Sequence, residues 1–411
     1  MAIQEGSELL VAGEARSSAA ALVKWFSRHG LAGYDPFDVY DHPLMRRAQA
    51  LADTRWGGRV WRRVYRFEQE HPRALRALLM NKPHENSKSV GLILGAWTRL
   101  TLAGIEPWPA DGRVLVRWLE RNRQPGYPGA SWSYPWGYQS RIFFPAGTPW
   151  GIVTAICGEA LLDYAELKSD EKALRLAREA AVFLAEAMPY VKAKTGGYLT
   201  YTPLDDFSIH NASISMGAYL ARAAARFGEG GWAEIARGCL DFTVAAQEPD
   251  GSFDYWGDGQ NVQRHVDNYH TGFVLRALLE YSELGYDSAS EPLRRGWDYY
   301  QRTFVNSQGR PMTYADREVP VDIHGCAESI LCGSALSLKF DDALNLAVRA
   351  ARWTAQHLQN RDGSFGYGVF GHGKQSIAYT RWGESWMLRA LSELCLSLAG
   401  ASAPAGFTGD E

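Results

Sequence analysis

The residues best suited to chemistry recur at one phase of a repeating pattern, where helical segments begin. The strongest cluster is Asp267-Asn268-Tyr269-His270, and a second cluster, Asp322-Ile323-His324, lies at the same phase of the next repeat. Imidazole and phenol groups carry protons to and from substrates. We therefore predict Tyr269, His270 and His324 as catalytic residues. Asp267 can instead be an ordinary helix cap, which is the usual role of an aspartate at a helix start.

Other polar residues at the same phase are predicted to bind substrate. They come from the cluster Ser208-Ile209-His210-Asn211, from Tyr379-Thr380-Arg381-Trp382 and from an aromatic loop that precedes another helical segment. Amides, guanidinium groups and aromatic rings bind the hydroxyl groups, carboxylates and C–H faces of sugars. The predicted substrate contacts are Tyr138, Arg141, His210, Asn211, Asn268, Tyr379, Arg381 and Trp382.

One carboxylate sits within an apolar helical segment. Glu384 is surrounded by the sequence YTRWGESWMLRAL. A buried glutamate needs a partner, so Glu384 is either paired with an arginine or catalytic, and we include it among the catalytic candidates.

No sequence pattern indicates a cofactor. The histidines lie on separate segments without HxH or HExxH spacing, and neither a GxGxxG nor a P-loop motif is present. We therefore expect no metal site and no nucleotide cofactor.

The elements that must position these residues form a repeat. Six segments share a polar or aromatic start followed by a helix rich in Ala, Gly and Leu, and their starts are 54 to 62 residues apart. This period accommodates two helices and a connection. The segments begin at Asn86, Thr148, Ser208, Asp267, Val321 and Tyr379.

Between these segments lie amphipathic helices with charged faces, such as EKALRLAREAAVFLAEAM and FDDALNLAVRAARWTAQHLQ. Apolar helices belong inside and charged amphipathic helices outside, so the alternation predicts an all-α fold, an (α/α)6 toroid. Gly-aromatic connections such as DGSFGYGVF predict short β-hairpins or loops at one mouth of the ring. We expect a single toroid domain over residues 1–400, with an N-terminal helical extension and first outer helix over 1–80 and a disordered tail over 401–411.

The bulk composition excludes several classes of protein. The 411 residues carry a formal net charge of −3, which does not fit a nucleic-acid-binding protein. Apolar helical stretches are interrupted by Arg, Glu or Gly, so no membrane span is predicted. The N-terminal residues show no secretory pattern, and the five cysteines lack CxxC spacing. We expect a cytoplasmic protein with buried, reduced thiols.

Several motifs together resemble a known family. The runs GYDPFD, SWSYPWGYQSRIFFPAGTPWGIVTAICGEALLDYAE, SIHNAS, DNYHTGFVL, VDIHGCAESI and YTRWGESWMLRALSEL occur in this order between about Gly33 and Leu398. They resemble polysaccharide-biosynthesis proteins of bacterial exopolysaccharide gene clusters, which are related to the α/α catalytic domain of heparosan-glucuronate C5-epimerases. One departure is Trp150-Gly151, where the resemblance leads us to expect Asn, and this puts a polar substrate contact there in question.

The resemblance implies a substrate that is an oligo- or polysaccharide containing uronic acid, with chemistry at C5. Such chemistry needs a group that neutralises the carboxylate, a base and an acid. Arg381 or Arg141 with Asn268 could bind the carboxylate, and Tyr269, His270 or His324 could move the proton. Whether the product is the C5 epimer or, after loss of a C4 leaving group, an unsaturated sugar stays open.

Three alternatives remain. A glycoside hydrolase would need two carboxyl groups, for which Asp206, Asp254, Asp267, Asp322 and Glu384 are candidates. A non-catalytic glycan-binding subunit of a polysaccharide synthesis complex would bind without turnover. The segment PLDDF faintly matches the acidic motif of terpene cyclases, which also use α/α toroids.

Overall fold

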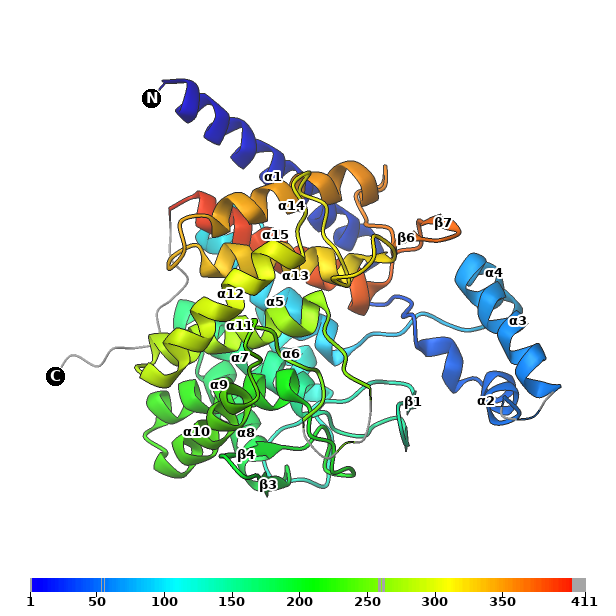
Figure 1. Ribbon diagram of the computed structural model, residues 1–411, viewed down its shortest axis with the longest axis horizontal. Coiled ribbons are helices and arrows are strands. Elements are labelled where there is room, and N and C mark those ends of the chain that lie inside the picture. The colour runs from blue at the N-terminus through cyan, green and yellow to red at the C-terminus, as the bar shows by residue number, and fades with distance from the viewer. Residues whose placement is uncertain (1, 53, 55, 258–259, 261–262, 401–411) are drawn as a thin grey trace.

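The computed structural model describes residues 2–52, 54, 56–257, 260 and 263–400, and helices dominate it (Figure 1). Six helices pack side by side, each against the next, and the last of them packs against the first, so they close a ring. These inner helices are α5 (Ser87–Leu102), α7 (Gly151–Lys168), α9 (His210–Phe227), α11 (Asn268–Glu283), α13 (Ile323–Leu336) and α15 (Ser385–Leu398).

A second layer of helices covers the ring. Each outer helix packs mainly against one inner helix, so the predicted (α/α)6 toroid is confirmed. The outer helices are α6 (Arg113–Arg121) on α5, α8 (Glu171–Glu186) on α7, α10 (Gly230–Ala245) on α9, α12 (Ser290–Thr303) on α11, α14 (Ala343–Leu358) on α13 and α1 (Ala2–His29) on α15.

Small residues explain why the inner helices approach one another closely. A Cβ atom on Gly91 of α5 would lie 3.0 Å from Sγ of Cys157 on α7, and one on Gly158 would lie 2.3 Å from the Tyr219 ring of α9. Almost all side chains along α5 and α7 are buried, whereas the outer helix α8 buries one face and carries charged side chains on the other. Because these helices consist mainly of small and apolar residues, α5 and α7 pack in the inner layer.

The N-terminal region adds an arm to the ring. After α1 come the 3-10 turn η1 (Asp38–Asp41) and the helices α2 (Pro43–Ala50), α3 (Gly57–Glu70) and α4 (Pro72–Leu78), which lie to one side of the helical body in Figure 1. The domain boundaries at 80 and 400 stay a prediction, and the predicted tail, 401–411, lies outside the described residues.

Short antiparallel strands accompany the N-terminal ends of the inner helices, as predicted. β1 (Tyr138–Gln139) pairs with β2 (Phe143–Phe144), and β3 (Tyr190–Lys192) pairs with β4 (Gly197–Leu199). β6 (Gly368–Phe370) lies between β5 (Val321–Asp322) and β7 (Gly373–Gln375). A further short 3-10 turn, η2 (Asp287–Ala289), precedes α12. These connections surround one mouth of the ring.

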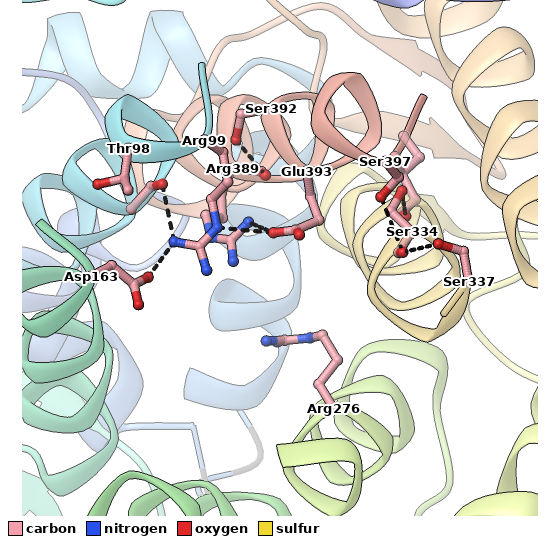
Figure 2. A network of polar contacts seen from close by, with 12 residues as sticks. Thr98, Arg99, Asp163, Arg276, Ser334, Ser337, Arg389, Ser392, Glu393 and Ser397 are labelled. Atoms are coloured by element: carbon pink, nitrogen blue, oxygen red, sulfur yellow. Dashed lines mark hydrogen bonds and ion pairs between the residues drawn. The ribbon is translucent and has the colours of Figure 1, made fainter. Parts of the chain in front are cut away.

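At the opposite end of the ring, charged residues bind the inner helices together around a cavity of about 560 Å³ (Figure 2). Arg99 of α5 contacts Asp163 of α7 and donates to Glu393 of α15 at 2.9 Å, and Arg389 donates to the same glutamate at 2.5 Å. Arg276 of α11 forms a separate ion pair with Glu328 of α13, at 2.7 Å. Because these carboxylates and guanidinium groups neutralise one another, we interpret this end as structural.

None of the helices in the described part of the chain is long and apolar enough to cross a membrane. All five cysteines are free and buried, in agreement with the prediction of buried thiols.

Candidate active site

A carboxylate held between two imidazoles forms the edge of the mouth. Oδ2 of Asp267 lies 2.7 Å from Nε2 of His265 and 2.7 Å from Nδ1 of His270, and its Oδ1 accepts from the His270 backbone N–H at 2.9 Å. Asp267 thus caps α11 and also fixes both rings. We call His265, Asp267 and His270 the histidine–aspartate group.

The electrostatics of this group follow from its geometry. Burial opposes ionisation of Asp267, but the two imidazoles overcome it and hold the pKa of the carboxyl below its ordinary value. The hydrogen bond to Asp267 raises the pKa of His265. With an ionised acceptor, Nδ1 of His270 is the donor, so its Nε2 carries a free lone pair in the neutral ring and is able to accept a proton.

Tyr269 joins this group to a second imidazole. The Tyr269 ring centroid lies 4.2 Å from that of His270 and 4.6 Å from that of His324, on which it stacks. His324 is buried, and among the described residues neither of its ring nitrogens has a hydrogen-bond partner. Burial, helped by the positive charges of Lys88 and Arg381, holds the pKa of His324 well below its usual range, so this ring is neutral.

A lysine lies deeper in the centre of the ring. Nζ of Lys88, at the start of α5, is 5.3 Å from the Trp386 ring centroid and 6.0 Å from that of Phe273, and both rings also contact His324. In the described chain, this buried amine makes no hydrogen bond or ion pair. Burial lowers the pKa of Lys88 to about 7. An amine in this state is available to an anionic group of a ligand.

Asp322 and Trp382 close the other side of the cluster. The Trp382 indole N–H lies 2.8 and 3.0 Å from the two carboxylate oxygens of Asp322, which also caps α13 through the His324 N–H. Burial raises the pKa of Asp322 to about 7. The Trp382 ring meets His324 edge-on at 4.6 Å and Tyr269 at 5.8 Å. Trp382 lies in η3 (Thr380–Glu384), a π-helical turn, a feature that is frequent at functional sites.

The structure thus brings together four predicted residues: Tyr269, His270, His324 and Trp382. Arg381 lies near them but is occupied, because its Nε and Nη2 donate to the two oxygens of Asp35 at 2.6 and 2.8 Å. This buried pair ties the N-terminal arm to the ring. The Arg381 guanidinium is stacked among aromatic rings, at 5.0 Å from the Tyr134 centroid.

Two other predicted residues serve internal contacts. Asn268 is fully buried, donates to Met312 O at 2.9 Å and to Ser329 Oγ at 3.0 Å, and accepts from Tyr300 at 2.7 Å. Glu384 is also fully buried, and both of its carboxylate oxygens accept from the Phe365 N–H at 3.0 Å. Burial holds the pKa of Glu384 well above its usual range.

The remaining predicted contacts are spread around the ring. His210 stacks on Phe242 of the outer helix α10 at 4.6 Å, and Asn211 is buried beside it on α9. Tyr379 is buried against Tyr367 at 4.9 Å.

Two predicted contacts come from the β1–β2 region. Tyr138 is half-buried and lies 5.3 Å from Phe37. Arg141 is exposed, with its guanidinium 5.4 Å from both the Phe207 and Trp256 centroids.

Sequence reasoning missed the importance of His265 and assigned no role to Lys88. The spacing His265-x-Asp267 could have suggested His265, because both residues precede the same helix. The histidine–aspartate group could also hold a metal ion, since its ligand atoms lie within 4.8 Å of one another. The two 2.7 Å contacts to one oxygen describe a hydrogen-bonded arrangement instead.

Comparisons with known proteins place the fold. No protein-family model matches the sequence, and no curated protein matches it significantly. Among solved structures, cellobiose 2-epimerase from Spirochaeta thermophila aligns with a TM-score of 0.58 and 17% identity over 78% of this chain and 87% of its own. A polysaccharide lyase aligns with a TM-score of 0.54 and 13% identity over 80% and 93% of the two chains.

An unsaturated glucuronyl hydrolase specific for heparin aligns with a TM-score of 0.55 and 12% identity over 75% of this chain and 85% of its own. At these identities the likeness establishes the toroid fold, on which different reactions are found.

Proposed function

We propose that the protein is a carbohydrate-active enzyme that removes a proton from C5 of a uronic acid residue in an oligo- or polysaccharide, as an epimerase or a lyase. The observation that carries the proposal is the cluster of His270, Tyr269 and His324, beside which the buried amine of Lys88, unpaired among the described residues, lies against the Trp386 and Phe273 rings that also contact His324. This set supplies proton carriers and a cation in one place. The epimerase, lyase and hydrolase among its structural neighbours act on saccharides and share the fold.

In the proposed reaction, Nε2 of His270 takes the C5 proton, and the electron pair passes into the adjacent carboxylate group. Lys88 neutralises this group, a task for which Arg381 is unsuited because Asp35 already occupies it. Burial keeps the Tyr269 phenol protonated, since its pKa is held well above the ordinary value. Tyr269 can therefore return a proton to C5 and produce the epimer.

If the C4–O bond breaks instead, the same carbanion forms a C4–C5 double bond. The leaving oxygen then takes a proton from Tyr269, and the product is an unsaturated sugar. The two reactions share the first step and differ in whether C4 carries a leaving group that is protonated.

Hydrolysis is disfavoured by the state of the carboxylates. It needs two carboxyl groups, one that donates a proton and one that attacks or activates water. Asp267 is held between two imidazoles, Glu384 is enclosed against the Phe365 amide, and Asp322 receives the Trp382 indole. Of these three, Asp322, with a pKa of about 7, could act as an acid, but it has no second carboxylate of this set free to assist it.

The proposal is tested by a panel of uronic-acid polysaccharides and oligosaccharides, with absorbance near the enoate band, product NMR and reducing-end assays. His270→Asn should lower turnover at least a hundredfold, because it removes the base. The matched control is His357→Asn, which changes an exposed histidine stacked on Trp353 of the outer helix α14. New reducing ends without an enoate or epimer, or full activity of His270→Asn, would overturn the proposal.

A further inference from the structure

A second cavity, of about 340 Å³, lies between the N-terminal arm and the mouth of the ring. Its aromatic lining comes from three parts of the chain: η1, α3 and the connections at the mouth. In Figure 1 the arm helices α2 and α3 lie beyond β1, to one side of the helical body. We call it the aromatic groove. Its aromatic residues are Phe37, Tyr40, Trp61, Tyr65, Tyr138 and Tyr367.

The aromatic groove continues from the candidate active site. Trp382, which contacts both Tyr269 and His324, lies 5.3 Å from the Phe37 ring centroid, and Phe37 lies 5.3 Å from Tyr138. Phe37 and Tyr138 are themselves part of the groove lining. A chain of ring contacts therefore leads from the imidazoles to the groove without a break.

The rings on the arm extend this path away from the ring. Tyr40 lies 6.0 Å from Trp61, and Trp61 lies 6.4 Å from Tyr65, one helical turn later on α3. The amides of Gln49, Gln69 and Gln139 complete the lining. Flat rings with interspersed amides suit the C–H faces and hydroxyl groups of successive sugar units.

Contacts with the ring hold the arm in place. Arg381 of η3 forms a buried ion pair with Asp35, just before η1, at 2.6 Å, and Gln375 in β7 donates to the backbone carbonyls of Gln69 and Glu70 at 2.7 and 3.1 Å. The arm is thus tied to the ring at two places along its length. Such anchoring reduces the ordering that binding would otherwise require.

The arm also carries a concentration of positive charge. Six exposed arginines lie on α2 and α3, whereas the whole chain has a net charge of −3. Arg62 and Arg66 follow Trp61 and Tyr65 directly on α3, so helix geometry puts each about 100° around the helix from the aromatic residue before it, and we infer that they flank the groove. Among the described residues, neither forms an ion pair. The six are Arg46, Arg47, Arg59, Arg62, Arg63 and Arg66.

We propose that the aromatic groove binds an acidic polysaccharide, with sugar rings stacked on its aromatic residues and carboxylates paired with Arg62 and Arg66. The reacting unit lies at the imidazoles, and the neighbouring units of the same chain run over Phe37 toward Trp61 and Tyr65. This inference rests on the proposed function for the identity of the reacting unit. It adds that the substrate is a polymer with repeated anionic groups, bound well beyond the unit that reacts.

The test compares two variants of equal charge. Arg62→Glu/Arg66→Glu reverses the two charges beside the aromatic residues of α3. Arg47→Glu/Arg63→Glu reverses two exposed charges on α2 and α3, each two residues, or about 200° around its helix, from the lining residues Gln49 and Trp61. Binding is measured by calorimetry at low salt with glucuronate-containing di-, tetra-, hexa- and octasaccharides, and with neutral cello-oligosaccharides of the same lengths. Tyr65→Ala removes a half-exposed ring of the groove without altering charge.

We expect the wild-type dissociation constant to fall as the acidic oligosaccharide lengthens from two to eight units. Arg62→Glu/Arg66→Glu should raise it at least tenfold for the octasaccharide and leave it unchanged for the disaccharide, while the Arg47/Arg63 control changes neither. Tyr65→Ala should weaken the octasaccharide severalfold. Circular dichroism establishes that the variants remain folded.

Equal losses in both charge variants, no dependence on length, or equal affinity for neutral oligosaccharides would overturn the inference. The readout is binding, so the two proposals fail separately. Length-dependent acidic binding without any turnover would contradict the proposed reaction but support the groove. Turnover of the substrate, together with unaltered binding by Arg62→Glu/Arg66→Glu, would support the proposed reaction but contradict the groove.

Discussion

Replacing Lys88 by methionine should make the protein more stable and inactive at the same time. Lys88 is buried against Trp386 and Phe273, and within the described chain no carboxylate pairs with it. Methionine fills nearly the same volume without a charge. A lysine kept for stability would give the opposite result on replacement, because its removal would break a favourable contact.

The size of the effect follows from the pKa. Burial lowers the Lys88 pKa from 10.5 to about 7 in the folded protein. At about 1.4 kcal/mol for each pH unit, this difference corresponds to roughly 5 kcal/mol, an upper limit for the cost of keeping the ammonium ion buried. We expect Lys88→Met to raise the free energy of unfolding by about 2–5 kcal/mol at pH 6.

The stability difference between Lys88→Met and the wild-type protein should depend on pH in a definite direction. Below pH 7 the lysine is protonated in both states, and the folded protein bears the full cost. Between pH 7 and 10.5 the unfolded chain binds a proton that the folded protein lacks, so wild-type stability rises with pH and the advantage of Lys88→Met shrinks.

Urea unfolding at pH 6, 8 and 10 measures this trend, together with turnover of the uronate panel. The matched control is Lys168→Met, which replaces an exposed lysine that also lies over a tryptophan, 5.1 Å from the Trp97 ring. Lys168→Met should change stability by less than about 0.5 kcal/mol and leave activity intact. A Lys88→Met variant that is less stable than wild type at pH 6, or fully active, would refute the role of Lys88.

Three further predictions concern other parts of the molecule. Burial raises the Asp322 pKa from 3.8 to about 7, so between these pH values the folded protein binds more protons than the unfolded chain, and its stability falls as pH rises. Asp322→Asn should make this fall smaller when the melting temperature is measured against pH. Arg99→Met should lower the free energy of urea unfolding by about 3–5 kcal/mol, because it leaves Asp163 and Glu393 with less compensation, and a loss below about 1 kcal/mol would contradict the structural role of the network in Figure 2. Dialysis against EDTA should not alter turnover, whereas a loss that Zn²⁺ or Mn²⁺ restores would show that the histidine–aspartate group holds a metal.

The toroid could be predicted from the sequence because its determinants are local and repeated. The inner helices follow polar or aromatic entry segments and continue with small and apolar residues, and the outer helices show charged faces. Asn86, Asp267 and Asp322 cap α5, α11 and α13 through their own side chains, within three residues along the chain. Such local features can be recognised in the sequence without knowledge of any distant contact.

The candidate site could be predicted only in part, because contacts with distant residues decide which of its polar side chains are engaged in internal hydrogen bonds and ion pairs. The sequence brought His270, Tyr269 and His324 to one mouth through the repeat. It could not show that the carboxylate of Asp35, 346 positions away, forms an ion pair with Arg381. Nor could it show that the backbone N–H of Phe365 donates to the Glu384 carboxylate. These buried contacts join segments that have no common pattern.

The same limit hid the role of Lys88. Lys88 begins an apolar segment predicted to lie inside the ring, but a lysine near a helix start usually extends into solvent, and the sequence could not show whether a carboxylate pairs with it. Its environment is created by Phe273 of α11 and Trp386 of α15, which meet it only when the ring closes. The sequence therefore favoured arginine for the carboxylate, whereas the structure favours this amine.

The most direct test of the account is deuterium incorporation at C5. Wild-type protein is incubated in deuterated water with the acidic oligosaccharide that it binds best, and the sugar is examined by proton NMR. The account predicts loss of the C5 proton signal with formation of the C5 epimer, or an unsaturated product whose C5 proton has passed to solvent, and neither in His270→Asn. Cleavage of the glycosidic bond with every C5 proton retained would contradict it.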